Sequence, residues 1–165
     1  AKDWELKDEE DGGSRVFKAL DLYQQDGYHN LVQIAERWGG AFLCDGVGLG
    51  KTFIGMMLLE RLVRYERKNV VLIVPKAARK AVWESSIEQY CPELLRQAYT
   101  GLRIINHTDI TREASGDVDW PALMDELRDE ADAVVIDEAH NFRNPGVQVD
   151  VDPKSGRLVS KTGKK

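Results

Sequence analysis

The chain has 165 residues, of which 42% are hydrophobic and 31% charged, with a formal net charge of −5. This length and composition suit one folded domain that buries its core without cross-links, and the acidic balance argues against a polycation that coats nucleic acid. Two widely separated cysteines, no secretory leader pattern and no apolar run of membrane length predict a soluble cytoplasmic chain without a membrane partner.

The first part of the chain, residues 1–14, is rich in acidic side chains and ends in Gly-Gly-Ser. This composition predicts a mobile acidic N-terminus with Trp4 as its anchor. Apolar residues then recur at helical spacing from Leu20 to Trp38, with Gly27 as a candidate break. We therefore expect two helices or one kinked helix before the glycine pair at 39–40.

A glycine-rich segment, DGVGLGKT, follows the short apolar run from Ala41 to Cys44. The run predicts a strand that ends in Cys44 as a small buried residue, and a helical pattern begins near Lys51. Glycines let backbone N–H groups approach a polyphosphate, and the helix N-terminus adds the positive end of its dipole. The residues of this predicted phosphate loop are Asp45, Gly46, Val47, Gly48, Leu49 and Gly50.

Lys51 and Thr52 complete the loop and predict a site for ATP and Mg²⁺. The Lys51 ammonium can reach the terminal phosphates as a point charge, and the Thr52 hydroxyl is placed to ligate the magnesium ion. The segment departs from the pattern GxxxxGK[ST], because Asp45 stands where the first glycine is expected. The alternative interpretation is a glycine-rich turn that starts an ordinary helix without a ligand.

Three further apolar segments predict buried strands, and they are Val70–Val74, Leu102–Asn106 and Ala133–Ile136. Amphipathic helices are predicted between the strands, from Lys51, from Ala77 to Tyr90 and from Trp120 to Glu130. Strands that alternate with helices predict an α/β fold, a mostly parallel sheet with helices on both faces. The loops after the four strands should then share the sheet edge at which such folds bind ligands.

Cations gather near the C-terminal end of the helix that begins at Lys51, and Arg61 and Arg64 are among them. We expect these two arginines to interact with the negative end of the helix dipole and with solvent, because that position favours cations.

Two adjacent acids, Asp137 and Glu138, directly follow the last predicted strand. Two charges at a buried strand end need water or a partner, and the phosphate loop on the same edge provides a role for each. Asp137 can hold the magnesium ion, and Glu138 can orient and deprotonate the water that attacks the γ-phosphate. Glu138 and Lys51 are thus the predicted catalytic residues, and an exposed acidic turn is the alternative interpretation.

Four segments together resemble the first RecA-like lobe of a Swi/Snf-type ATPase of helicase superfamily two. They are LYQQDG at 22–27, DGVGLGKT at 45–52, VVLIVPKAARKAVWE at 70–84 and DEAH at 137–140. The resemblance implies a RecA-like P-loop NTPase fold, ATP and Mg²⁺ as cofactors, and duplex DNA as the nucleic-acid partner. It accounts for Asp45, since the motif commonly begins with aspartate in this family, whereas Gly46 departs from the usual glutamate.

The resemblance also implies residue roles that the spacing alone does not give. Gln24 would read adenine with Tyr23 beside it, and Gln25 stays open as an alternative reader. The segment after Pro75 would contact the nucleic-acid backbone, with solvated surface as an equal alternative. Its candidate contact residues are Lys76, Arg79 and Lys80.

His140 ends the DEAH segment, and the resemblance implies that it couples the γ-phosphate state to the nucleic acid and the partner lobe. A histidine satisfied within its own loop is the alternative interpretation. Asn106, His107 and Thr108 fall where the resemblance implies a further strand-contacting loop.

The predicted ATP-binding lobe spans residues 15–143, and residues 144–165 form a separate tail. In the tail, VQVDV and RLVSK flank DPKSG, which predicts a β-hairpin, with a disordered basic arm as the alternative. The family's second RecA-like lobe and its arginine finger have no counterpart here. We therefore expect a part of a larger motor that binds nucleotide better than it hydrolyses it.

The leading hypothesis is the ATP-binding lobe of a DNA translocase or remodelling-type ATPase. One alternative is a DExH-type helicase lobe that works on RNA or within a restriction or defence complex, and this lobe alone does not separate the two. Another is a nucleotide-gated binding module without useful hydrolysis. Such a module would keep Lys51 and Thr52 but need not place Glu138 where water can attack.

Overall fold

The computed structural model describes residues 2–44, 50–96, 101–110 and 119–142, and the backbone of 149–151 and 158–160. Helices and strands follow one another in the order α1 (Asp3–Leu6), η1 (Glu9–Asp11), α2 (Arg15–Ala19), α3 (Leu22–Trp38), α4 (Lys51–Glu60), η2 (Arg61–Tyr65), β1 (Val70–Val74), α5 (Lys76–Ala78), η3 (Arg79–Glu84), α6 (Ser85–Tyr90), η4 (Pro92–Leu95), β2 (Leu102–Asn106), η5 (His107–Asp109), α7 (Trp120–Glu130), β3 (Ala133–Ile136), η6 (Ala139–Phe142), β4 (Val149–Val151) and β5 (Leu158–Ser160).

Strands β1, β2 and β3 form a parallel sheet in the order β2-β1-β3. Val70 of β1 is paired with Leu102 on one side and with Ala133 on the other, so β1 is the central strand. Every residue of β1 is buried, which is why its sequence, VVLIV, has no polar position. The predicted bounds of all three strands are confirmed.

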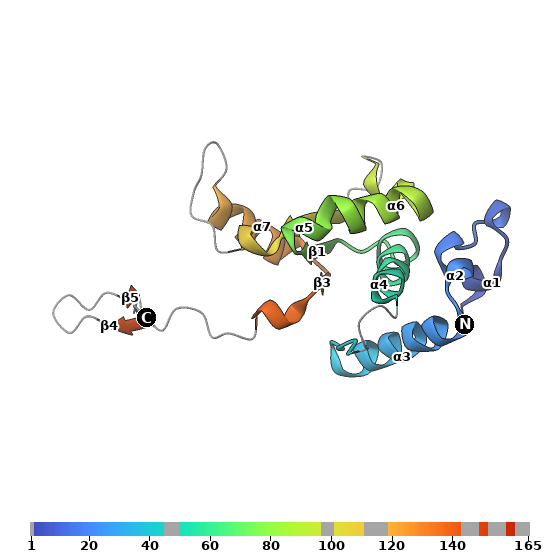
Figure 1. Ribbon diagram of the computed structural model, residues 1–165, viewed down its shortest axis with the longest axis horizontal. Coiled ribbons are helices and arrows are strands. Elements are labelled where there is room, and N and C mark those ends of the chain that lie inside the picture. The colour runs from blue at the N-terminus through green and yellow to red at the C-terminus, as the bar shows by residue number, and fades with distance from the viewer. Residues whose placement is uncertain are drawn as a thin grey trace.

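Different helices cover the two faces of the sheet, and Figure 1 shows α4 and α7 on opposite sides of β1. Leu72 of β1 shares one core cluster with Ile54 of α4. Ile73, the next residue of β1, belongs to a second cluster with Leu127 of α7. This alternation follows from the strand period of two, and it confirms the predicted α/β fold with helices on both faces.

Helix α3 runs without a break through Gly27. The sequence predicts either two helices or one kinked helix here, and the structure has one helix. A Cβ atom at Gly27 would lie 3.3 Å from Cδ1 of Ile54, so the glycine allows α3 and α4 to approach closely. The Asp21 carboxylate accepts a hydrogen bond from the Gln24 backbone N–H at the start of α3. Gly39 ends the helix in the left-handed conformation.

The segment 41–44, which the sequence predicts to be a strand, has no strand structure. Phe42 is 84% exposed and Cys44 is exposed, whereas Leu43 packs against the core. A strand needs a neighbour for its backbone hydrogen bonds, and within the described residues this segment pairs with none of β1, β2 and β3. The predictions of a strand here and of a buried Cys44 are therefore wrong.

The acidic N-terminal residues form the short helical segments α1 and η1, although the composition predicts a mobile terminus. Trp4 stacks on Tyr65 with 3.7 Å between ring centroids and 9° between ring planes. Ser14 accepts a hydrogen bond from the Phe17 backbone N–H and so caps α2. The role of Trp4 as an anchor is thus observed, because its stacking partner Tyr65 lies far along the chain.

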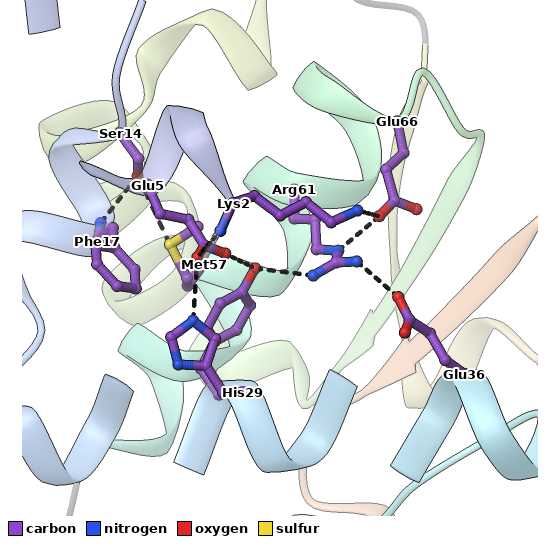
Figure 2. Close-up of polar contacts among 10 residues, drawn as sticks. Lys2, Glu5, Ser14, Phe17, His29, Glu36, Met57, Arg61 and Glu66 are labelled. Carbon is purple, nitrogen blue, oxygen red and sulfur yellow. Dashed lines mark hydrogen bonds and ion pairs between the residues drawn. The ribbon is translucent and has the colours of Figure 1, made fainter. Parts of the chain in front are cut away.

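Glu5 of α1 lies at the centre of a polar cluster, shown in Figure 2, and is only 1% exposed. Its Oε1 accepts a hydrogen bond from the Tyr28 hydroxyl at 2.9 Å, and its Oε2 accepts one from the Lys2 backbone N–H at 2.7 Å. Nε2 of His29 lies 3.1 Å from the same Oε2. Burial by itself raises the pKa of the Glu5 carboxyl, but these hydrogen bonds outweigh it and lower the pKa below its ordinary value of 4.5.

Arg61 and Arg64 are held in ion pairs, so the expectation that they are solvated charges is wrong. Arg61 is 4% exposed, and its guanidinium contacts Glu36 at 2.7 Å and Glu66 at 2.6 Å (Figure 2). Nη1 of Arg64 lies 3.2 Å from Oε1 of Glu93 and also contacts Glu60. Their acidic partners come from α3 and η4 as well as from the same helix. The prediction considers only the dipole of that helix, so it does not include these partners.

Strands β4 and β5 form an antiparallel pair in which Val149 is opposite Ser160 and Val151 is opposite Leu158. This pairing agrees with the hairpin interpretation of the tail. Residues 152–157, where the turn is predicted, and the basic residues 161–165 lie outside the described residues. Within the described ranges, no helix has both the length and the apolar character that a bilayer span requires.

Candidate functional site

The loops that follow β1, β2 and β3 meet at the carboxyl edge of the sheet. Nε2 of His107, after β2, lies 2.8 Å from the backbone oxygen of Asp137, after β3. Nδ1 of the same histidine lies 3.4 Å from Nδ2 of Asn141. The indole of Trp83, in the segment that follows β1, donates to the Asp137 carboxylate. The predicted convergence of polar loops is therefore confirmed for the loops after β2 and β3, and Trp83, beyond the predicted loop 75–79 after β1, joins them.

Asp137 continues the sheet ladder by one residue, since its backbone N–H donates to the Ile73 oxygen at 2.9 Å. Its Oδ2 accepts a hydrogen bond from Nε1 of Trp83 at 2.8 Å. Trp83 is 3% exposed, and sequence reasoning missed it. A tryptophan in an amphipathic helical pattern is expected to be a core residue. No feature of the sequence links Trp83 to Asp137.

Glu138 adopts a left-handed backbone conformation with φ of 53°, which is uncommon for a residue other than glycine. Its backbone oxygen accepts a hydrogen bond from the Asn141 N–H at 3.0 Å, and this closes the turn into η6. Oε2 of Glu138 lies 3.0 Å from Nδ1 of His140, and both side chains are exposed. The turn thus places the Asp137 carboxylate against the protein and the Glu138 carboxylate toward solvent.

The end of the predicted phosphate loop is described at Gly50, which precedes α4. Gly50 has φ of 78°, a conformation that favours glycine, and Lys51 and Thr52 form the first turn of the helix. A Cβ atom at Gly50 would lie 2.0 Å from Nε2 of Gln24. The positive φ therefore favours glycine at position 50, and the Gln24 amide lies close to its backbone. The rest of the loop, Asp45 to Leu49, lies outside the described residues.

The two candidate adenine readers have different surroundings. Oε1 of Gln24 accepts a hydrogen bond from the Asp21 backbone N–H at 3.1 Å, and the amide lies against the start of α4. Gln25 instead donates through Nε2 to the Leu20 backbone oxygen at 3.0 Å. Tyr23 is exposed beside them. Of the two glutamines, Gln24 is thus the one that adjoins the predicted phosphate loop.

The three predicted nucleic-acid residues lie in α5 and η3. Lys76 and Lys80 are exposed. Nε of Arg79 forms an ion pair with Oε1 of Glu84 at 2.8 Å. Two of the three cations therefore face solvent, whereas the third already has an acidic partner.

Asn106, at the end of β2, adds a buried acceptor to the same edge. Its Oδ1 is buried and has no hydrogen-bond partner among the described residues, while its Nδ2 donates to Oδ2 of Asp109 at 2.7 Å. The contact with Asp109 fixes which way the amide faces, so the Asn106 oxygen can accept a hydrogen bond from a further group.

The residues at this edge fit a magnesium ion. In the described part of the chain no three His, Cys, Asp or Glu side chains are grouped as a metal site. Mg²⁺ at phosphate sites takes one or two carboxylates together with phosphate oxygens and water, so it does not need such a group. Because Trp83 engages Oδ2 of Asp137, the second carboxylate oxygen keeps its lone pairs for another ligand. The Thr52 hydroxyl, in the first turn of α4, is the other donor that the sequence predicts.

A cavity of about 140 Å³ lies at the other end of the sheet, lined by the amino ends of β1 and β2 and the C-terminal end of α7. Its lining includes Asn69, Arg103 and Glu130. None of the predicted site residues lines this cavity, so it is separate from the carboxyl edge.

Comparison with known proteins shows a match to the SNF2-related domain over residues 23–113, which is more than half of the chain. The matched range includes Gln24, the glycine-rich segment and Lys76, and it ends before Asp137. No solved structure matches the chain.

Two curated relatives are similar to this chain. The chromatin-remodeling ATPase INO80 of Arabidopsis thaliana is 36% identical over 90 residues, which are 52% of this chain and 6% of that protein. The chromodomain-helicase-DNA-binding protein 1-like of Mus musculus is 29% identical over 136 residues, which are 76% of this chain and 15% of that protein. The chain thus spans a small part of the length of either relative. Together with the RecA-like sheet, the family match shows that the chain belongs to the SNF2-related family and is a Swi/Snf-like first lobe of helicase superfamily two.

Proposed function

We propose that this chain is the ATP-binding lobe of a nucleic-acid-dependent ATPase of the DNA translocase or helicase type. The observation that supports it best is the position of Trp83 between two nucleotide motifs. Its ring lies against Gly55 of α4, one turn after Lys51, and its N–H donates to Asp137. The helix that follows the phosphate loop and the acidic strand end are thus held on either side of one indole ring.

In this proposal the glycine-rich loop and Lys51 bind the phosphates, while Thr52 and Asp137 hold Mg²⁺. When bound, Mg²⁺ supplies positive charge that neutralises the phosphate oxygens during transfer. Glu138 orients and deprotonates the attacking water. The exposed position of the Glu138 carboxylate and its left-handed backbone support this role, because strained residues cluster at active sites.

Gln24 is the proposed adenine reader, with Tyr23 beside it. The contact of the Gln24 amide with Gly50 supports this choice, since it places the amide next to the phosphate loop. Gln25 is less suited, because its amide is engaged with the backbone of Leu20.

Duplex DNA is the proposed nucleic-acid partner, contacted by Lys76, Lys80 and Arg79. The exposure of the two lysines supports this, as do the names of the two relatives, which describe chromatin remodelling and DNA binding. His140, paired with Glu138, is the proposed coupling residue. The lobe is proposed to span residues 15–143, with the tail from 144 to 165 outside it.

Efficient hydrolysis is proposed to need the arginine finger of a second RecA-like lobe. An arginine finger contributes about 10³- to 10⁵-fold to the rate of phosphoryl transfer in related reactions. The lobe alone should therefore bind nucleotide measurably and turn it over slowly.

Thermal unfolding with and without Mg·ADP tests the proposal. Nucleotide at 100 times its dissociation constant should stabilise the lobe by about 2.7 kcal/mol and raise the melting temperature. Lys51→Ala should abolish the shift, whereas Lys7→Ala, an exposed lysine in the N-terminal segment, should keep it. An unchanged melting temperature at millimolar Mg·ADP would contradict the proposal.

A further inference from the structure

Trp83 touches two elements of the proposed nucleotide site. A Cβ atom at Gly55 of α4 would lie 2.7 Å from Cη2 of Trp83 and 3.4 Å from its Cζ3. The six-membered part of the indole therefore lies directly against the backbone of α4. At the other end of the ring, Nε1 donates to Oδ2 of Asp137 at 2.8 Å.

The hydrogen bond to Asp137 satisfies the polar group of a buried side chain. An indole has one donor and no acceptor, and a buried donor without a partner is costly. Trp83 is 3% exposed, so the Asp137 carboxylate supplies the acceptor that the ring needs. Because the acceptor is a carboxylate, this hydrogen bond is among the stronger ones in proteins.

The contact with Gly55 fixes where the donor lies. Any side chain at position 55 would occupy space that the ring already fills, so the glycine and the indole fit together. The separation between α4 and the Asp137 carboxylate is consequently set by the width of a rigid ring. A flexible side chain at position 83 would leave that separation undefined.

We infer that Trp83 is a positioning residue for Asp137, which it holds with one oxygen toward the bound magnesium ion. The inference rests on the proposed function, because it assigns Asp137 the role of magnesium ligand. Trp83 also belongs to the helical segment that begins at Lys76 and carries the proposed nucleic-acid contacts.

The first test compares ADP affinity with and without Mg²⁺ in Trp83→Phe and in the control Trp38→Phe. Phenylalanine keeps an aromatic ring against Gly55 but has no N–H, whereas Trp38 is exposed at the end of α3. Loss of an outer-shell partner typically weakens metal binding 10- to 100-fold. We expect Trp83→Phe to lower the gain from Mg²⁺ by about 10-fold and to leave Mg²⁺-free affinity unchanged, and the control to match the wild type.

The second test needs no substitution in the measured protein. The indole ¹⁵N–¹H resonance of Trp83, assigned by its absence in Trp83→Phe or in Trp83→Leu, reports the hydrogen bond in the wild type. It should move when Mg·ADP is added and respond much less to ADP in the presence of EDTA. In Asp137→Asn the resonance of the free protein should itself be displaced.

The outcomes separate the two proposals. A wild-type chain that binds neither ADP nor Mg·ADP overturns the proposed function and this inference with it. A wild type that gains affinity from Mg²⁺, with the same gain in Trp83→Phe and an indole resonance indifferent to Mg·ADP, overturns the inference alone. If Trp83→Phe does not fold, the wild-type resonance decides the matter.

Discussion

The hydroxyl of Tyr28 donates a 2.9 Å hydrogen bond to Oε1 of Glu5, and both side chains are buried. This single contact joins α3 to α1 across 23 positions of sequence. It is also one of the bonds that keep a buried carboxylate ionised, so the N-terminal segment is attached to the lobe through a charge.

Tyr28→Phe should destabilise the lobe by about 1–3 kcal/mol, because it leaves the Glu5 carboxylate short of a donor. The measurement is urea unfolding followed by far-UV circular dichroism. Tyr90→Phe is the matched control, since Tyr90 contacts Phe53 through its ring and its hydroxyl has no hydrogen bond among the described residues. Equal stability of the two variants would contradict the importance of the contact.

Glu5→Gln should destabilise the lobe at neutral pH, and the difference from the wild type should shrink as the pH falls. The pKa of Glu5 is lowered in the folded state, since the hydrogen bonds from His29, Lys2 and Tyr28 outweigh burial. Its stabilising contribution is therefore complete above the ordinary value of 4.5 and is lost as the pH falls through the lower folded value. Urea unfolding of both proteins between neutral pH and pH about 3 measures the difference.

Glu60→Gln is the matched comparison, because the pKa of Glu60 is raised. Burial raises this pKa above 4.5, although Ser14 and Arg64 donate hydrogen bonds to the carboxylate. The contribution of Glu60 is complete below 4.5 and is lost as the pH rises through the folded value. The two glutamine variants should therefore change the pH dependence of stability in opposite directions, and parallel profiles would contradict the assignment.

Gly55→Ala should destabilise the lobe although it improves helix propensity. Alanine in a helix interior gains about 1 kcal/mol over glycine, whereas an added atom in a packed core costs about 1–3 kcal/mol. At Gly55 the added Cβ meets the indole of Trp83 at 2.7 Å, and the hydrogen bond to Asp137 opposes movement of the ring.

Gly27→Ala is the control for this substitution, because its Cβ would meet only Cδ1 of Ile54, at the longer distance of 3.3 Å. Thermal unfolding should show a larger loss at position 55 than at position 27. The loss at position 55 should also shrink in a Trp83→Leu background, where the side chain is smaller. A stabilised Gly55→Ala variant would show that the ring moves aside freely.

Thiol alkylation should distinguish Cys44 from Cys91. Cys91 is buried, and burial raises the pKa of its thiol, so the folded chain should react at neutral pH through exposed Cys44. Mass spectrometry should show one adduct in the folded chain and two in denaturant. Since Cys44 directly precedes Asp45, Mg·ADP should slow its reaction, and no protection at saturating nucleotide would count against a phosphate loop at 45–52.

Replacing Lys76 and Lys80 with alanine should weaken binding of duplex DNA and make it less sensitive to salt. Each lost phosphate contact should reduce the slope of log affinity against log salt by about 0.9. Arg79→Ala should have a smaller effect, because its guanidinium is already paired with Glu84. Lys7→Ala is the control, and the same titration with duplex RNA tests the alternative substrate.

The sequence predicts the parts of the fold that depend on local pattern. The three apolar strands and helix α7 have the bounds that their patterns predict, and parallel crossovers correctly bring Asn106, His107 and Asp137 to one edge. The segment from Ala41 to Cys44 is different. Its apolar residues have the composition of a strand, but it pairs with no other strand among the described residues.

The contacts that organise the candidate site depend on packing between distant segments. Trp83 and Asp137 are 54 positions apart, and only the folded sheet brings them together. Composition also does not predict that Glu5, in an acidic terminus, is buried. Its carboxylate is buried because side chains of α3 donate hydrogen bonds to it. Motifs therefore identify the residues that meet the nucleotide, and tertiary packing identifies those that hold them.

The π-helical form of η3 makes the place of Trp83 depend on the length of the chain as well as on its sequence. A π-helical turn holds about one more residue than an α-helical turn, so it acts as a single-residue insertion in an α-helix. Removing one residue from that turn, such as exposed Ala81, would let it close as an α-helical turn, so the residues before and after it could keep their places. Trp83 lies within the turn, so its indole would move relative to Gly55 and Asp137 while the phosphate loop and the DEAH segment stayed intact. The length of this turn therefore matters to the site as much as the identity of its residues.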